Sequence, residues 1–267
     1  MSFTEHNQNG VIYTTADHIS APHAFTTRFG GVSAGIYASL NLGENRGDDP
    51  DCVRENYRRL KAALGIDELV FSRQVHGTDV RRVTAADARE PFDPLPYEAD
   101  GLVTDEPGLS LIIFVADCIP ILFHDPIRGA VGAAHAGWRG TVADIAGITV
   151  RRMVSEFGSD PKHIRTAIGP GIAACCFETG PEVPEAVLNA LGDEGTAFIT
   201  PSRNPGKSMV DLKGVNRALL LRSGILPEHI AVSPACTMCH PDKYWSHRHT
   251  HGERGVQAAI ITLKRSI

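Results

Sequence analysis

Short apolar runs, each ended by turn residues, dominate the middle of the chain. Residues 109–115, 119–124 and 130–135 are almost wholly apolar, and the polar pair Asp117-Cys118 and the turn at Asp125-Pro126 separate them. Apolar runs of this length, bounded by turn residues, are typical of buried strands. Further strands are expected at residues 24–28, 79–83, 164–168, 197–200, 230–233 and 257–263.

Apolar positions at helical spacing predict four helices. The first runs from Pro50 to Leu64, where Asp48 or Asp49 can cap the start and Gly65 ends the helix. The others are expected at residues 141–157, 181–191 and 211–222, and the proline-rich residues 86–99 are expected to form a surface loop. Because strands and helices are mixed rather than strictly alternating, the sequence predicts an α+β fold. We expect one domain, residues 1–267, with mixed or antiparallel β-sheets flanked by helices.

Composition and charge narrow the class of protein. The chain has 267 residues, of which 42% are hydrophobic and 21% charged, as in ordinary globular proteins. A formal net charge of -5 argues against proteins that coat nucleic acid or bind membrane surfaces, since both need a basic field. The N-terminus does not resemble a signal peptide, and no apolar run approaches the roughly 18 residues of a membrane helix. We therefore expect a cytoplasmic protein whose six cysteines are reduced.

Three polar side chains stand at points where the chain is expected to turn or a strand to end. His76 precedes Gly77, Cys118 lies between two strands, and His135 ends a third. Two imidazoles and one thiolate would give zinc three protein ligands and leave a fourth position open, as in catalytic sites. Taken alone, a histidine at a turn is equally well explained by the turn, and the long separations make spacing a weak signal.

The segment that follows His135 is rich in glycine. Gly137 and Gly140 stand between the expected strand and the expected helix, and Arg139 adds a cation. Free backbone N–H groups and a helix N-terminus favour an anion such as phosphate. An equally weighted interpretation is that the glycines only permit a tight turn.

Cysteines and histidines are also concentrated near the C-terminus. Residues 236–240 read CTMCH and match the haem-attachment pattern, which we discount because no export signal is present. As a zinc half-site, Cys236 and Cys239 lack a second CxxC partner. His247, His249 and His251 alternate, so on a strand they would share one face that could bind copper or zinc, although a solvated basic edge is favoured. The adjacent pair at residues 175–176 is interpreted as part of a turn shaping the cleft wall, without assigned chemistry.

Six segments, in this order, resemble one known family. They are SRQVHGT at 72–78, ADGLVT at 99–104, ADCIPILFHDP at 116–126, GAVGAAHAGWRGT at 129–141, IGPGI…CCFE at 168–178 and CT…YWSHR at 236–248. The chain is similar in these segments, which span nearly its whole length, to the laccase-domain family. Its members are also called polyphenol oxidase-like, YfiH-type or peptidoglycan editing factor proteins. The resemblance implies one domain with mixed sheets flanked by helices.

The same resemblance implies a metal and an activity. Zinc would be held by His76, Cys118 and His135, with copper as the alternative metal. The implied activity is that of a purine nucleoside phosphorylase, which cleaves adenosine, inosine and S-methyl-5'-thioadenosine with phosphate to ribose 1-phosphate and free base. Adenosine deaminase would be a side activity. The expected partners are purine nucleosides and phosphate, and the expected state is a monomer or small homo-oligomer.

The resemblance also suggests residues around the pocket. Arg73 and Arg248 match basic positions, and Asn41 begins the shared motif Asn-Leu-Gly. Together with Arg139 they form the expected substrate-binding and phosphate-binding set. The histidine usual shortly after that motif is missing, since residues 44–46 read ENR.

The mechanism expected for a phosphorylase assigns a proton donor, and other functions remain open. Asp117 would protonate the departing purine if burial raises its pKa. One alternative is a hydrolase or amidase, including one for peptidoglycan-related peptides, with Cys118 as nucleophile and His76 or His135 as base. Others are a copper polyphenol oxidase, which would need further copper ligands, and a zinc-stabilised binding protein acting in cell-wall editing.

Overall fold

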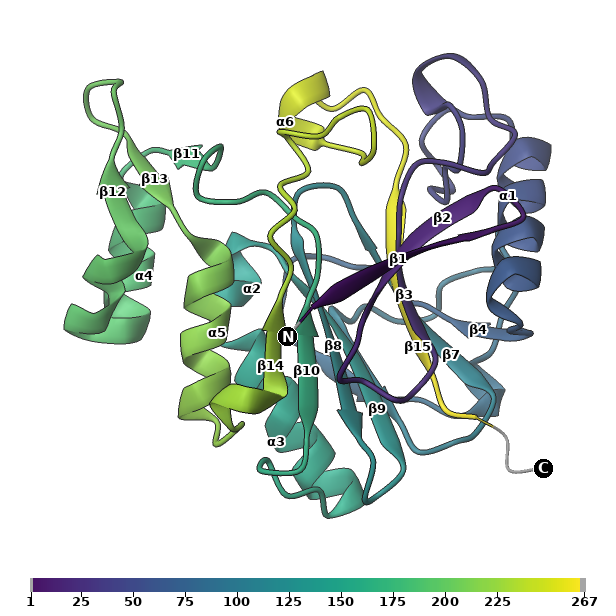
Figure 1. Cartoon of the computed structure of the whole chain (residues 1–267), viewed down its shortest axis with the longest axis horizontal. Helices are drawn as coiled ribbons and strands as arrows, with labels where there is room; N and C mark the ends of the chain where they lie inside the picture. The colour runs from purple at the N-terminus through teal and green to yellow at the C-terminus, as the bar shows by residue number, and fades with distance from the viewer. Residues whose placement is uncertain (1, 265–267) are drawn as a thin grey trace.

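Two six-stranded sheets form the centre of the protein (Figure 1). The structure is a computed structural model that describes residues 2–264, so the ends of the domain predicted for residues 1–267 lie outside it. In spatial order the first sheet contains β1 (Phe3–Gln8), β2 (Val11–Ala16), β3 (His23–Thr26), β15 (Gln257–Thr262), β7 (Leu109–Val115) and β4 (Glu68–Val70). The second contains β14 (Ile230–Val232), β10 (Arg165–Ile168), β8 (Ile119–Asp125), β9 (Ala130–Ala136), β6 (Gly101–Thr104) and β5 (Val80–Arg82). Each sheet mixes antiparallel and parallel pairs, as predicted.

Helices cover the outer faces of the two sheets. The helices are α1 (Pro50–Leu64), α2 (Trp138–Val142), α3 (Ile145–Phe157), α4 (Glu182–Leu191), α5 (Leu212–Arg222) and α6 (His247–Thr250). Helix α1 packs on the first sheet, and α3 and α5 pack on the second. A small sheet of β11 (Glu178–Thr179), β13 (Ser208–Val210) and β12 (Ile199–Pro201) stands with α4 at one side (Figure 1). The predicted α+β architecture of mixed sheets flanked by helices is therefore confirmed.

The central strands are continuously apolar because both of their faces are buried. On β7, Leu111 and Ile113 contact the core between the two sheets, whereas Ile112 contacts the core under α1. On β8, Leu122 faces the inter-sheet core, and Phe123 faces the core beneath the outer helices. This alternation of buried side chains follows from the two-residue period of a strand.

Helix boundaries agree with the sequence except at one point. Asp49 caps α1 by accepting a hydrogen bond from the backbone N–H of Asp51, and Gly65 ends the helix in the left-handed conformation. The single helix expected over residues 141–157 is wrong, because the chain breaks between α2 and α3. Asp144 adopts φ 62° there and caps α3 through Gly147 N. The strand expected at residues 197–200 is present as β12, Ile199–Pro201, but it begins two residues later because a 3-10 helix, Gly192–Phe198, precedes it.

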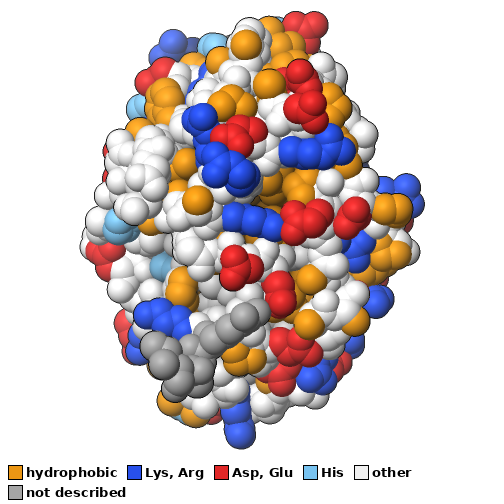
Figure 2. Space-filling model, turned by 90° about the vertical axis from the view of Figure 1, so that its right-hand side faces the viewer, with side chains coloured by type: hydrophobic (Ala, Val, Ile, Leu, Met, Phe, Trp, Pro, Cys, Tyr) orange, Lys and Arg blue, Asp and Glu red, His pale blue; other side chains and the backbone are white. Residues whose placement is uncertain are grey.

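The face that carries α1 bears charges of both signs. Figure 2 shows Lys and Arg side chains interspersed with Asp and Glu side chains on this side of the molecule. Glu55 pairs with Arg58 and Arg59 along the helix, and Lys61 pairs with Glu90 across from it. The balance on this face agrees with the modest net charge. Within residues 2–264 no helix is both long and apolar enough to cross a membrane.

Candidate metal centre

Cys118 and His135 meet because two strands run antiparallel. Cys118 directly precedes β8, and His135 lies near the end of β9, where it pairs with Pro120. Asp117 adopts φ 83° at the sharp crossing from β7 in one sheet to β8 in the other. The two side chains therefore project from the same end of one rigid sheet, which holds side chains more accurately than a loop does.

A buried carboxylate, Asp100, connects both histidines. It directly precedes β6, the strand that pairs with β9 on its other side. Its Oδ1 atom accepts a hydrogen bond from His135 Nδ1 at 2.7 Å. The same carboxylate accepts hydrogen bonds from the backbone N–H groups of Val75, His76 and Gly77 at 3.1, 3.0 and 2.7 Å. The loop carrying His76, which itself has φ 61°, is thereby tied to the strand that carries His135.

The three predicted ligands lie together. One ligand atom each from His76, Cys118 and His135 lies within 4.8 Å of the others, and Cys118 Sγ is 3.8 Å from His76 Nε2. The two imidazole rings pack edge to face with centroids 4.8 Å apart. Because Asp100 binds Nδ1 of His135, Nε2 is the atom left for a metal, in the carboxylate–histidine arrangement common around bound metals.

The electrostatics of this group favour the Cys118 thiolate paired with a protonated His135. Burial opposes ionisation of the Cys118 thiol, but His135 and His76 outweigh it and lower the pKa of Cys118 to about 6. Burial likewise opposes protonation of His135, but Cys118 and Asp100 outweigh it and raise the pKa of His135 to about 9. The thiolate is the form that binds metals, and a divalent ion would replace the proton of the imidazolium as its counter-charge. The residues present therefore fit zinc.

A cavity of about 320 Å³ opens beside the three ligands. Its apolar wall includes Phe71 and Phe114, whose rings pack edge to face with centroids 5.5 Å apart. Its polar lining comprises Glu44, Asn45, Arg46, Ser72, Arg73, Gln74 and Arg254. A cavity of this size, with aromatic walls and a few charged groups, is typical of a small-molecule site.

Two cationic residues of the cavity lining, Arg46 and Arg254, were not predicted from the sequence. Burial and the neighbouring Arg46 lower the pKa of Arg254 to about 10. The Nε atom of Arg254 is buried and has no hydrogen-bond partner in the described part of the chain. A buried donor without a partner is costly, so this guanidinium is suited to an anionic ligand. Arg46 lies in the segment where the sequence resemblance led us to expect a histidine.

Of the other residues predicted from the sequence, one lines the cavity and four do not. Arg73 lines the cavity and pairs with Glu98 at 2.7 Å. Among the described residues, the lining does not include Arg139, Arg248, Asn41 or Asp117. Arg139 is exposed and lies 4.3 Å from the centroid of the ring of Trp138.

Arg248, Asp117 and Asn41 form hydrogen bonds with other residues of the protein. Arg248 donates from Nη1 to Glu178 O at 2.8 Å. Asp117 accepts from Thr237 Oγ1 at 2.6 Å and from the backbone N–H of Arg248 at 2.7 Å. The Oδ1 atom of Asn41, a fully buried residue, accepts from the backbone N–H groups of residues 43 and 256. These bonds fix the loops behind the cavity.

The structure corrects two interpretations of the C-terminal motifs. His247, His249 and His251 do not alternate on a strand, because Ser246 caps a short helix, α6, at this point. Cys236 and Cys239 do have a second pair of cysteines, supplied by the adjacent residues Cys175 and Cys176. Sequence reasoning missed it because this pair is not a CxxC motif and lies about sixty residues away.

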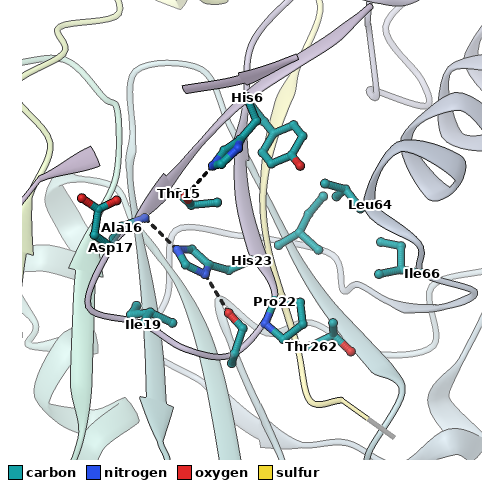
Figure 3. Close-up of a pocket in the computed structure, with 13 residues that line it drawn as sticks. His6, Thr15, Ala16, Asp17, Ile19, Pro22, His23, Leu64, Ile66 and Thr262 are labelled. Carbon is teal, nitrogen blue, oxygen red and sulfur yellow. Dashed lines mark hydrogen bonds between the residues drawn. The ribbon is translucent and has the colours of Figure 1, made fainter. Parts of the chain in front are cut away.

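A second cavity lies between the strands at the N-terminus and the end of α1 (Figure 3). His23 Nε2 accepts from Ala16 N and its Nδ1 donates to Ala21 O, both at 2.8 Å. His6 Nε2 is 2.8 Å from Thr15 Oγ1. Both histidines already form hydrogen bonds within the protein. They are therefore explained by the structure of these strands and do not indicate a second functional site.

Comparison with known proteins places the chain among named relatives. A purine nucleoside phosphorylase of Deinococcus radiodurans is 42% identical over 258 residues, which cover 96% of this chain and 94% of that protein. The purine nucleoside phosphorylase YlmD of Geobacillus stearothermophilus is 40% identical over 88% of each chain. The crystal structure of YlmD from this organism matches with a TM-score of 0.92 and 37% identity, and the match covers 98% of this chain and 99% of that one.

A second solved structure and a family profile agree with these relatives. The structure of the hypothetical protein YfiH from Bacillus licheniformis matches with a TM-score of 0.88 and 33% identity, covering 96% of this chain and 97% of that one. The profile described as multi-copper polyphenol oxidoreductase laccase matches residues 22–264. The family expected from the sequence motifs is thus confirmed, and the chain belongs to the laccase-like, multi-copper polyphenol oxidoreductase family.

Proposed function

We propose that the chain is a purine nucleoside phosphorylase with a zinc ion held by His76, Cys118 and His135. Its substrates would be adenosine, inosine and S-methyl-5'-thioadenosine, with adenosine deamination as a side activity. The observation that carries the proposal is that one cavity combines the three-ligand group, an aromatic wall and Arg254, whose buried Nε atom has no partner within residues 2–264. The names of the relatives agree with this activity.

The lack of further histidine-rich metal groups within residues 2–264 favours zinc over the chemistry of a copper polyphenol oxidase. Two imidazoles and a thiolate suit zinc and leave a coordination position open, where the ion acts as a Lewis acid when bound. A copper polyphenol oxidase would need further coppers with histidine ligands. Within residues 2–264 the other candidate metal group consists of cysteines alone.

The lining suggests how the substrates would lie. Phe114, a half-buried ring backed by the buried Phe71, offers aromatic surface against which a purine can stack. Arg254 and Arg46 offer charged donors for phosphate, and Arg73 adds a third cation at the edge of the cavity. Held between these groups, a phosphate oxygen forms a bond to ribose C1' while the bond from C1' to the purine nitrogen breaks. The bonding electrons depart with the base, which then takes up a proton.

Glu44 is the carboxyl group in the cavity that can supply this proton. Burial raises the pKa of Glu44, and its Oε1 atom is buried without a partner among residues 2–264. A carboxyl with a raised pKa is suited to general-acid catalysis near neutral pH. Asp117, the donor predicted from the sequence, is held by Thr237 and Arg248. Glu44→Gln and Asp117→Asn therefore test the two assignments separately through kcat.

The deciding experiment is phosphate-dependent release of hypoxanthine from inosine and adenine from adenosine, with and without a chelator. We expect release to require both phosphate and metal. Cys118→Ala should abolish it, whereas Cys52→Ala, at a cysteine on the outer helix α1, should not. Full activity in metal-free protein, or no release from folded, zinc-loaded protein, would refute the proposal.

A second candidate, cysteine-based hydrolysis, is favoured by the lowered pKa of Cys118 beside two histidines. A thiolate paired with an imidazolium is the reactive state of such nucleophiles. Hydrolysis of an amide, including a peptidoglycan-related peptide, would be lost on thiol alkylation and would survive chelation. The phosphorylase predicts loss under both treatments, so the pair of treatments separates the two functions.

A further inference from the structure

We propose a second, structural zinc site formed by four thiolates, those of Cys175, Cys176, Cys236 and Cys239. The four Sγ atoms all lie within 4.8 Å of one another. Within residues 2–264 this is the one group of candidate metal ligands besides His76, Cys118 and His135. The inference does not depend on the proposed enzymatic activity.

Sheet topology brings the four cysteines together. β10 and β14 are neighbouring parallel strands, and Ile168 pairs with Val232 near their carboxyl ends. The chain continues in parallel beyond both strands, because Gly171 forms a bridge with Cys236. One loop then turns through residues 173–177 and the other through residues 236–240. Each loop supplies two cysteines at the same edge of the sheet.

The distances suit a tetrahedral metal better than a disulfide. Cys239 Sγ lies 3.3 Å from Cys176 Sγ and 3.5 Å from Cys175 Sγ. Zinc with sulfur ligands at about 2.3 Å places those sulfurs about 3.8 Å apart. A disulfide would instead draw one pair to about 2.05 Å and leave the other thiols behind. Cys239 is nearly equidistant from two thiols, as a shared central ion requires.

The surroundings of Cys236 can stabilise its thiolate. The backbone N–H of Ala173 donates to Cys236 Sγ at 3.4 Å. Lys213, a buried residue of α5, donates from Nζ to Ser233 O at 2.9 Å and to Ala235 O at 2.7 Å, and interacts electrostatically with Cys236. Four thiolates around a divalent ion carry two net negative charges. A buried ammonium group beside them partly offsets this charge and orients the loop, as surrounding groups do at metal sites.

The position of the site indicates a structural role. Four protein ligands close the coordination shell and leave no open position for a substrate. Thr237, between the two cysteines of the second loop, donates from Oγ1 to Asp117, which directly precedes Cys118. A metal that joins the two loops would therefore hold Thr237 and, through it, Asp117 next to Cys118, from a location outside the cavity.

The test is the zinc content of the full chain, purified with zinc and analysed by mass spectrometry of metals. We expect two zinc ions per wild-type chain. The double variant Cys175→Ser/Cys239→Ser should lose one, and Cys118→Ala should lose the other. Cys52→Ser is the matched control and should keep both. If the pocket does not bind zinc, wild-type protein will hold one ion that survives Cys118→Ala, so failures of the two proposals are distinguishable.

Measurements on wild-type protein cover the case in which the double variant fails to fold. X-ray absorption at the zinc edge should show a sulfur-rich average shell. The cluster thiols should resist alkylation until a chelator is added. One zinc per chain that disappears with Cys118→Ala, a disulfide among the four cysteines in intact mass, or iron in place of zinc would each overturn the proposal.

Discussion

Asp100 Oδ1 accepts a hydrogen bond from His135 Nδ1 at 2.7 Å, while the same carboxylate binds the backbone N–H of His76 at 3.0 Å. One fully buried side chain thus sets the ring orientation of one proposed metal ligand and the backbone position of another. Charge-assisted hydrogen bonds of this kind are stronger and more directional than neutral ones. The geometry of the candidate metal centre therefore depends on a residue outside the proposed ligand set.

Asp100→Asn should weaken zinc binding by about 10- to 100-fold. The amide carries no charge, and its NH₂ group would face the N–H groups that the carboxylate now accepts from. The measurement is a competition titration of zinc against a chromophoric chelator. Asp105→Asn is the control, because Asp105 pairs with Arg82 at the surface. Unchanged zinc affinity in folded Asp100→Asn would contradict this role.

Gly137→Ala tests how closely the ligands are packed. Gly137 has φ −64°, which alanine readily adopts, so the expected effect is steric. An added Cβ would lie 2.7 Å from His76 Cδ2 and 3.3 Å from Cys118 Sγ. The imidazole must move away, and we expect zinc affinity to fall by about tenfold or more, as for other displaced ligands. A variant with normal thermal stability and wild-type zinc affinity would show that the ring has room to move.

The sequence predicts best those elements that are buried on two sides. Strands β7, β8 and β9 are continuous apolar runs because helices or another sheet cover both faces. The hairpin of β1 and β2 was missed because β1, Phe3–Gln8, is an exposed, largely polar edge strand. The one local signal was its Asn9-Gly10 turn, where both residues have positive φ. The break before α3 was missed because apolar spacing continues through Asp144.

The residues of the candidate site could likewise be predicted only in part from the sequence. Cys118 and His135 were found because they interrupt or end apolar strands, so sequence position alone marks them. Asp100 and Arg254 carry no such mark, since their importance comes from contacts over long sequence separations. The four-cysteine group required the parallel pairing of β10 with β14, which no local pattern reveals.

Arg254→Met should raise the KM for phosphate by about tenfold or more if this guanidinium binds phosphate, because a charge-assisted hydrogen bond contributes about 1.5–3 kcal/mol. Steady-state rates at varied phosphate and saturating inosine measure the effect. Arg139→Met is the matched control, because Arg139 is exposed on α2 and does not belong to the described residues that line the cavity. An increase in KM with Arg139→Met instead would restore the phosphate position predicted from the sequence.

Acid should destabilise the protein through histidines that are buried in the neutral form. Burial and then Arg165 lower the pKa of His124 on β8 to about 4, and its Nδ1 atom is buried without a partner in the described chain. Burial also lowers the pKa of His23, whose Nε2 accepts a hydrogen bond and must stay unprotonated. Because these two histidines bind fewer protons in the folded protein than in the unfolded chain, their contribution to stability is complete above about pH 6.5 and falls as the pH approaches 4.

For His124 alone, a shift from the ordinary value of 6.5 to about 4 corresponds to a loss of about 2 kcal/mol between neutral pH and about pH 5. Urea unfolding at the two pH values measures this loss. His124→Gln cannot titrate, so its stability should depend less on pH whatever its stability at neutral pH. His163→Gln, at an exposed position before β10, should keep the wild-type dependence. Equal pH dependence in wild type and His124→Gln would show that protonation of this strand residue does not limit acid stability.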